Sequence, residues 1–350
     1  MAAASDDRAA LTFTPSPERF VVEEIAAYAP VGAGEHTYLW IEKRGLTTMD
    51  AVRRLARLLD VDPRDVGYAG LKDRNAVTRQ WVSVPRVDPE RARQVSESDL
   101  AVLEVSRHGN KLRTGHLRGN RFELVVGVPV EDASEDATAR ALVALRARVL
   151  ALAATGVPNR YGEQRFGAAG DNAAAGLAIL RGERRERDHR LSKLLLSAAQ
   201  SAVFNRALDL RAARAGGLGA VLAGDVLQKV ETGGLFITED VAADQPRVDA
   251  GELVVTGPLP GGREKEPPPG TPARAVEDAA IAAMGATRED FARAGRDLPG
   301  ARRPFVVPLA LGDPPVQPEP GLSSPSEAAL RLRFSLPAGS YATVVVAALA

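Results

Sequence analysis

The sequence predicts an α+β protein with a second domain inserted into the first. Segments with strand-like and helix-like patterns alternate through about the first 150 of the 350 residues. A mainly helical segment of different character follows, from about residue 180 to 305, and strand-like patterns return near the end. We therefore expect one domain built from both ends of the chain, residues 1–182 and 306–350, and an inserted domain over residues 183–305.

Apolar alternation and turn residues predict six strands in the first part of the chain. They cover residues 19–30, 36–45, 66–73, 78–85, 100–110 and 120–129. Helical spacing of Val52, Leu55 and Leu59 after Thr47 predicts a capped amphipathic helix over residues 47–60. A second helix is predicted over residues 132–156, where acids occupy the first turn, as the helix dipole prefers.

The second part of the chain is less regular. Residues 171–216 are strongly helical in pattern, and short strands are predicted over residues 224–230, 235–240 and 252–260. Proline and glycine predict a loop over residues 261–274 and a flexible connector over residues 311–328. The last stretch, residues 329–350, returns to strand-like alternation and ends in a β-branched run.

Composition excludes several classes of function. Lys plus Arg and Asp plus Glu number 45 each, so any basic surface for a polyanion must be local. The chain has no cysteine and its four histidines show no paired-ligand spacing, so we predict no catalytic metal. No signal peptide is expected in residues 1–10, and no apolar run approaches the about 18 residues of a membrane span. A cytoplasmic protein is expected.

The stretch "YAGLKDRNAVTRQW" (residues 68–81) brackets Asp73 between Lys72 and Arg74. Gly67 and Gly70 permit tight backbone geometry around the lead-in. The two cations should point away from Asp73 yet favour its ionised form. Such a triplet is equally typical of an exposed turn with ordinary surface ion pairs, so spacing alone leaves both interpretations open.

The stretch "NRYGEQRFG" (residues 159–167) combines amides, rings and a cation. Tyr161 and Phe166 offer ring faces for an unstacked base, Asn159 can read its polar edge, and Arg165 can contact a phosphate. The alternative is a helix-terminating loop whose two rings pack into the core.

Residues 181–193, "RGERRERDHRLSK", carry a local excess of arginine. Arg184, Arg185 and Arg187 suit an RNA backbone, although a solvated helix start with internal ion pairs has the same composition. No phosphate-binding loop, nucleophile elbow or dinucleotide fingerprint is present in the sequence.

Taken together, these stretches resemble the TruD family of tRNA pseudouridine synthases. The similar segments occur in the family's order and span nearly the whole chain. They are "RFVVEE", "GAGEHTYLWIEKRGLTT", "YAGLKDRNAVTRQW", "VPNRYGEQRFG", "LSKLLLSAAQSAVFNRAL", "GDV", "TGPL" and "LPAGSYAT".

The resemblance implies a pseudouridine-synthase catalytic domain, with a mixed, largely antiparallel sheet and flanking helices, and an inserted α/β domain of the family's own. It implies isomerisation of uridine to pseudouridine in RNA, typically at position 13 in the D-arm of tRNA. It also implies tRNA as the partner, no cofactor, no metal and no membrane, and we expect a monomer. Alternatives are a non-catalytic RNA-binding or RNA-folding protein on the same scaffold and an unrelated small-molecule enzyme.

Residue by residue, the resemblance places Asp73 at the catalytic aspartate. Lys72 and Arg74 are its neighbours in the motif, and we expect them, like Phe166, to bind the substrate. Asn159 and Tyr161 match the amide and aromatic positions of the uracil pocket, and Tyr341 matches a second aromatic.

One departure concerns the first motif. A basic residue common in the family just before it is replaced by Thr14, and an Asp within it by Arg19. Lys72 or Arg19 is expected to take over the role of that base, if any residue does.

Overall fold

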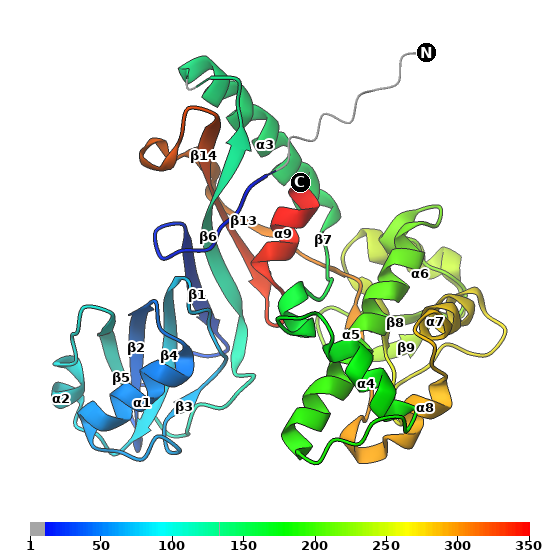
Figure 1. Ribbon diagram of the computed structural model, residues 1–350, viewed down its shortest axis with the longest axis horizontal. Coiled ribbons are helices and arrows are strands. Elements are labelled where there is room, and N and C mark those ends of the chain that lie inside the picture. The colour runs from blue at the N-terminus through cyan, green and yellow to red at the C-terminus, as the bar shows by residue number, and fades with distance from the viewer. Residues whose placement is uncertain (1–10, 133) are drawn as a thin grey trace. The chain divides into compact units, whose positions relative to one another are not determined.

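The structure is a computed structural model that describes residues 11–132 and 134–350 (Figure 1). The signal-peptide prediction for residues 1–10, and Ala133 of the predicted helix, lie outside the described residues. Packing divides the chain into unit 1, Met1–Thr155 with Pro308–Ala350, and unit 2, Gly156–Val307. These bounds differ from the domain boundaries expected at 182/183 and 305/306, and the assignment of a functional domain to either unit stays a prediction.

Unit 1 is built on an eight-stranded sheet. Its strands are β1 (Phe20–Ala26), β2 (His36–Arg44), β3 (Gly67–Tyr68), β4 (Val77–Pro85), β5 (Leu100–His108), β6 (Leu117–Pro129), β13 (Ala310–Pro318) and β14 (Glu327–Pro337). The order is β13-β14-β6-β1-β4-β2-β5, with β3 paired to β4. Only β1 and β4 run parallel among these pairs, so the expected α+β class with a largely antiparallel sheet is confirmed.

The helices of unit 1 are α1 (Thr48–Leu59), α2 (Pro89–Arg93), α3 (Glu135–Thr155) and α9 (Ala342–Leu349). Helix α1 begins as predicted, because Thr47 and Asp50 form a reciprocal capping box. Its buried face, which includes Val52, Leu55 and Leu59, packs on the core side chains of β2 and β4. Helix α3 contacts β13, β14 and α9.

Residues 311–328 are not the flexible connector that their prolines suggested. Most of them form β13 and the turn that leads into β14. Strands β13 and β14 pair side by side in the sheet (Figure 1). Proline lacks the N–H that a central strand must donate, but β13 is the edge strand of the sheet and tolerates it. A register shift between Leu311 and Val316 takes up the intervening Gly-Asp-Pro-Pro segment.

The β-branched run at the end of the chain is also not a strand, because residues 342–349 form helix α9. Its buried residues are Ala342, Val345, Val346 and Leu349. Their spacing of i, i+3, i+4 and i+7 is that of an amphipathic helix, and tertiary packing therefore overrides the preference of valine for strands.

Unit 2 combines helices with a small antiparallel sheet of order β11-β10-β8-β9 and a short β7–β12 pair. Its strands are β7 (Val157–Pro158), β8 (Val226–Lys229), β9 (Leu235–Ile237), β10 (Leu253–Leu259), β11 (Ala301–Pro304) and β12 (Val306–Val307). Its helices are α4 (Asn172–Leu180), α5 (His189–Ala212), α6 (Val241–Asp249), α7 (Pro272–Ala283) and α8 (Arg288–Arg293). The core gathers around Phe204, Phe291 and Phe305.

The predicted helical region 171–216 is divided into α4 and α5 by a non-helical segment, residues 181–188. Asp188 caps the start of α5 by accepting hydrogen bonds from two backbone N–H groups. The two helices pack closely: a Cβ at Gly176 of α4 would lie 2.1 Å from the Leu195 carbonyl oxygen of α5, so only glycine fits there.

Among the described residues, no helix has the length and apolar character needed to cross a membrane.

Candidate active site

Asp73 lies in unit 1, in the connection between β3 and β4. Of the strand predicted over residues 66–73, only β3 (Gly67–Tyr68) is present, and Asp73 lies beyond its end. The lead-in is tightly packed, since a Cβ at Gly67 would lie 2.3 Å from the Leu112 carbonyl oxygen. Gly70 is under no such constraint, because a Cβ there would come no closer than 3.5 Å to any neighbouring group. The spatial requirement for glycine is therefore met at one of the two expected positions.

Lys72 points into the protein and forms a buried ion pair with Glu24 of β1. Its Nζ donates to Glu24 Oε2 at 2.7 Å, and the two side chains are 3% and 1% exposed. Glu24 Oε1 also accepts from the backbone N–H of Trp81. Burial raises the pKa of Glu24 even though Lys72 and these hydrogen bonds act in the opposite direction. The pair therefore ties the connection that carries Asp73 to the centre of the sheet.

Two further side chains hold the backbone of this connection. Thr48, at the start of α1, accepts from the backbone N–H of Lys72 at 2.8 Å and donates to Gln80 Oε1 at 3.0 Å. Gln80 in turn donates from Nε2 to the Gly70 carbonyl oxygen at 3.1 Å. Both side chains are buried, so the backbone on the near side of Asp73 is fixed from α1 and from β4.

Lys43 of β2 is the cation that contacts Asp73 itself. Its buried Nζ donates to the Asp73 carbonyl oxygen at 2.8 Å and to the Leu46 carbonyl oxygen at 2.6 Å. Burial lowers the pKa of this amine to about 8, against the opposing charge of Asp73. Sequence reasoning missed Lys43 and Glu24 as site residues, although both stand inside the similar segments "WIEKRG" and "RFVVEE".

The expected balance of charge around Asp73 is only partly found. The charges of Lys43 and, after it, Lys72 lower the pKa of the Asp73 carboxyl, but desolvation by the surrounding protein is larger and raises it overall. The side chain itself remains exposed, so this desolvation is incomplete. Arg74 is not among the charges that shift this pKa, and its Nε donates to the Gly45 carbonyl oxygen.

The other unit 1 positions that the resemblance singled out lie apart from this network. Arg19 donates to the Leu322 carbonyl oxygen at 3.0 Å, and Thr14 is exposed. Tyr341 is half-buried immediately before α9, and its side chain makes no hydrogen bond or ring contact with the part of the chain that the structure describes.

The second predicted stretch lies in unit 2, where Asn159 and Tyr161 come together. Asn159 is 5% exposed, and its Nδ2 donates to the Pro304 carbonyl oxygen at 3.0 Å. The half-buried Tyr161 ring packs edge-on against Phe204 at 5.6 Å between centroids. The guanidinium of Arg303 lies over the Tyr161 ring, 4.2 Å from its centroid, and also bonds to Asn159. No pattern in the sequence pointed to Arg303, which stands on β11.

Arg165 and Phe166 belong to a short 3-10 turn, Glu163–Phe166. Arg165 donates to Ser201 and to Ser197 of α5, and its guanidinium lies 5.6 Å from the Tyr161 ring centroid. Phe166 is half-buried and makes no ring contact among the described residues. Arg165 thus lies beside Tyr161, whereas the Phe166 ring makes no contact with the Tyr161 ring.

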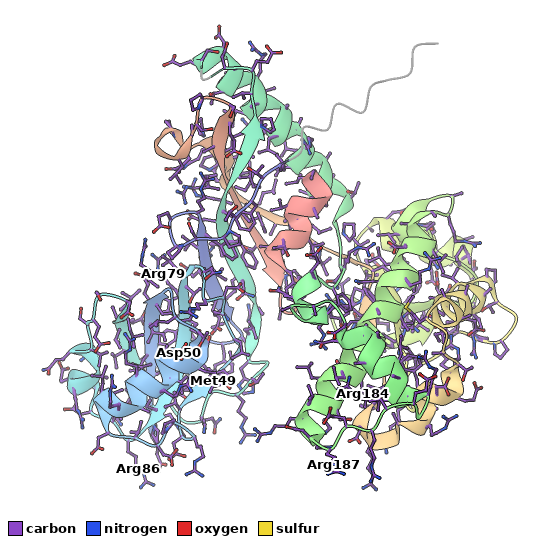
Figure 2. The ribbon with its side chains drawn as sticks, in the orientation of Figure 1. Met49, Asp50, Arg79, Arg86, Arg184 and Arg187 are labelled. Carbon is purple, nitrogen blue, oxygen red and sulfur yellow. The ribbon has the colours of Figure 1, made fainter. Side chains whose placement is uncertain are left out.

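The three expected RNA-contacting arginines lie together in the segment between α4 and α5, where Figure 2 labels Arg184 and Arg187. All three are exposed. Arg184 is 3.3 Å from Glu186 in an ion pair, while the side chains of Arg185 and Arg187 make no ion pair or hydrogen bond within the described chain. Of these three arginines only Arg184 is ion-paired, although Arg181 of the same segment also pairs with Glu183.

No group of three or more His, Cys, Asp or Glu side chains in the described residues could hold a metal ion. The polar groups gathered in the two units are instead carboxylate, ammonium, guanidinium and amide. Carboxylate and ammonium groups can exchange protons, whereas guanidinium and amide groups bind and orient.

Comparisons with known proteins place these features in one family. The family model for tRNA pseudouridine synthase D (TruD) matches residues 4–189 and 184–349. A tRNA pseudouridine synthase D from Anaeromyxobacter dehalogenans is 47% identical over 95% of this chain and 90% of its own length. One from Thermus thermophilus is 41% identical over 93% of this chain and 85% of its own.

A solved structure from Methanosarcina mazei, described as a tRNA pseudouridine synthase D (TruD), has the same fold. It superposes with a TM-score of 0.72 at 22% identity, over 96% of this chain and 94% of that one. The architecture and the matched sequence define a member of the pseudouridine synthases. This chain belongs to the TruD family, and the resemblance noted in its sequence is confirmed.

The buried ion pair gives a test of how the Asp73 connection is held. Lys72→Met or Glu24→Gln alone should destabilise the protein by about 3–5 kcal/mol, because each leaves the other partner buried without its counterpart. The double variant should lose clearly less than the sum. Free energies of unfolding from urea titrations complete the double-mutant cycle.

The partly exposed pair Arg79–Glu42 is the matched control, with side chains 37% and 34% exposed. Its coupling should stay below about 1 kcal/mol. Strictly additive effects of Lys72→Met and Glu24→Gln would show that the two buried side chains do not stabilise each other.

Proposed function

We propose that this chain is a tRNA pseudouridine synthase that isomerises uridine to pseudouridine at position 13 in the D-arm, without a cofactor. It would be an intramolecular transferase. The observation that carries the proposal is Asp73, an exposed carboxyl on a connection anchored by the Lys72–Glu24 pair and contacted by Lys43. The names of the relatives support the activity and the tRNA substrate.

The reaction detaches uracil from the ribose, turns it and rejoins it through carbon. A carboxylate can act as nucleophile at the sugar or at the base, or can remove a proton from the sugar. Each role requires an ionised Asp73. The ammonium groups of Lys43 and Lys72 favour that form against the desolvation that opposes it. In this proposal Lys72 supports the carboxylate from inside the protein and does not touch the substrate.

The target base must leave its stack in the folded arm, at a cost of a few kcal/mol. Stacking on the rings of Tyr161 or Tyr341 contributes about 1–3 kcal/mol per base and can offset that cost. Asn159 offers an amide to the detached uracil while it turns. The adjoining Arg165 and the exposed arginines at 184, 185 and 187 suit the RNA backbone.

Lys43 is proposed as the basic group that supports Asp73, in place of the residue that the family often has near position 14. Arg19 is a poorer candidate, because its guanidinium is bound to the Leu322 carbonyl oxygen. Lys43 instead contacts the backbone of Asp73 and is the largest source of positive charge at its carboxyl.

Replacement of Asp73 tests the catalytic assignment. Asp73→Asn should lower pseudouridine formation in a tRNA transcript by about 10²–10⁴-fold or more, because the amide is neither a nucleophile nor a base. Binding of the same tRNA should stay within about threefold of wild type, since the contacts to the backbone remain. Appreciable product from this variant would remove Asp73 from the mechanism.

The pKa of Lys43 predicts an alkaline limit to activity. Its amine is charged below about pH 8 and becomes neutral as the pH rises through that value, so wild-type activity should fall there. Lys43→Met should be slower at pH 7 by about tenfold or more, because the ammonium that stabilises negative charge at the reacting carboxylate is lost. Its pH profile should no longer fall around pH 8.

Single-turnover rates between pH 6 and 9.5 compare the two proteins on one tRNA. Titration of the RNA affects both alike, so only the difference between the profiles reports on Lys43. An unchanged alkaline limb in Lys43→Met would assign that limb to another group.

The arginine segment is tested through salt dependence. Replacing Arg184, Arg185 and Arg187 by Gln should weaken tRNA binding and reduce the slope of log K against log salt by about 2. Arg184 should contribute least because of its ion pair with Glu186. Arg140 and Arg146, both exposed on α3, are replaced together as the control. An equal change of slope in both variants would show that the arginines of residues 184–187 contribute no more to tRNA binding than other exposed arginines.

A further inference from the structure

The amide of Asn159 is held on both of its polar atoms by β11 (Ala301–Pro304). Oδ1 accepts a hydrogen bond from Nη2 of Arg303, and Nδ2 donates to the carbonyl oxygen of Pro304 at 3.0 Å. Arg303 also donates from Nε to the Asn159 backbone carbonyl oxygen at 3.1 Å. One guanidinium therefore donates hydrogen bonds to both the side chain and the backbone of Asn159.

These partners fix which way round the amide lies. A guanidinium has only donors, so the amide atom that faces Arg303 must be the oxygen. A backbone carbonyl has only acceptors, so the atom that faces Pro304 must be the nitrogen. A flipped amide would set an NH₂ group against the cation and an oxygen against a carbonyl. Because Asn159 is 5% exposed, water offers little compensation for those two lost bonds.

The same guanidinium also positions the neighbouring ring. It lies 4.2 Å from the Tyr161 ring centroid and 5.5 Å from that of Phe204, and Phe204 meets Tyr161 edge-on. Asn205 binds the backbone of Tyr161 in both directions, accepting from its N–H and donating to its carbonyl oxygen, each at 2.9 Å. Ring and amide are thus set relative to each other by Arg303.

We propose that Arg303 is a specificity-determining residue, which locks the Asn159 amide in the orientation that reads uracil and rejects cytosine. The proposal rests on the proposed function, in which Asn159 receives the target base. It adds to that function a residue on β11 that acts through Asn159 and Tyr161.

The remaining bonding capacity of the amide explains the choice of base. An amide has two N–H donors and two lone pairs, and the two protein partners take one of each. What remains is one acceptor for the N3–H of uracil and one donor for an adjacent carbonyl oxygen. Cytosine presents the reverse pattern, an acceptor at N3 beside an amino donor. Only a flipped amide would match cytosine in the same pose, and Arg303 opposes that flip.

The experiment that tests this compares RNA binding without turnover. Every protein in it carries Asp73→Asn, so that the U transcript is not converted, and wild type and variant differ only at the arginine under test. Two tRNA transcripts carry U or C at the modified position, and Kd is measured for each by fluorescence anisotropy at constant salt. Contacts to the RNA backbone are common to both transcripts and cancel in the ratio of the two Kd values. Wild type should prefer the U transcript by about tenfold or more, since a well-placed pair of hydrogen bonds discriminates against the wrong base.

Arg303→Met should bring the ratio close to one. Arg303→Lys should give an intermediate value, because an ammonium can still donate but lacks the planar fork that holds Asn159 at two points while its face covers the Tyr161 ring. Arg206→Met is the matched control, an exposed arginine of α5 next to Asn205 whose side chain makes no hydrogen bond or ion pair in the described chain. It removes the same charge from unit 2 and should keep the wild-type ratio. If Arg303→Met fails to fold in a thermal melt, Arg303→Lys decides.

A wild-type ratio in the folded Arg303 variants, or a ratio of one in wild type, overturns the inference. An equal loss of preference in Arg206→Met also overturns it, because the effect would then be one of general charge. Pseudouridine formation by wild type on the U transcript is measured alongside. Its absence would count against the proposed function, whereas product together with an unchanged ratio counts against Arg303 alone.

Discussion

The buried ion pair between Lys72 and Glu24 is the interaction on which the arrangement around Asp73 depends. It joins the connection after β3 to β1, the strand that runs parallel to β4 in the middle of the sheet. Two charged groups cannot stay buried unless each meets the other, so the pair dictates where Lys72 points. Because Lys72 is directed inward, the next residue, Asp73, is left on the exposed side. The hydrogen bonds of Thr48 to the Lys72 backbone and to Gln80 reinforce the same geometry.

Charge at this site results from competition between burial and attraction. Lys43 and Lys72 lower the pKa of the Asp73 carboxyl while desolvation raises it, and desolvation is the larger effect. Burial also lowers the pKa of Lys43 to about 8. The sequence triplet Lys-Asp-Arg suggested a simpler arrangement in which both flanking cations act on the acid. The cation that lowers the pKa of Asp73 most is instead Lys43 of β2. Arg74 donates to the Gly45 carbonyl oxygen.

The sequence predicted what depends on local pattern and missed what depends on distant partners. The capped helix α1, the strands around it and the turn that carries Asp73 follow from spacing and cap residues in short windows. Residues 311–328 were misjudged because a proline-rich edge strand is stabilised by its neighbour β14. Helix α9 was missed because its β-branched residues favour a strand, although its apolar residues also have the i, i+3, i+4 and i+7 spacing of a helix. Lys43 and Glu24 lay within similar segments, yet nothing local shows that one side chain reaches the Asp73 backbone and the other reaches Lys72.

Asn159 shows the same limit more sharply. The stretch "NRYGEQRFG" provides an amide and a ring, but an amide side chain can present either a donor or an acceptor at a given point, and its own segment does not decide which. The decision comes from Arg303 and Pro304 of β11, with Arg303 lying 144 residues further along the chain. Since a guanidinium only donates and a carbonyl only accepts, those two partners determine where the oxygen and the nitrogen of the Asn159 amide lie. The chemistry offered by a motif residue is in this case determined by the strand that packs behind it.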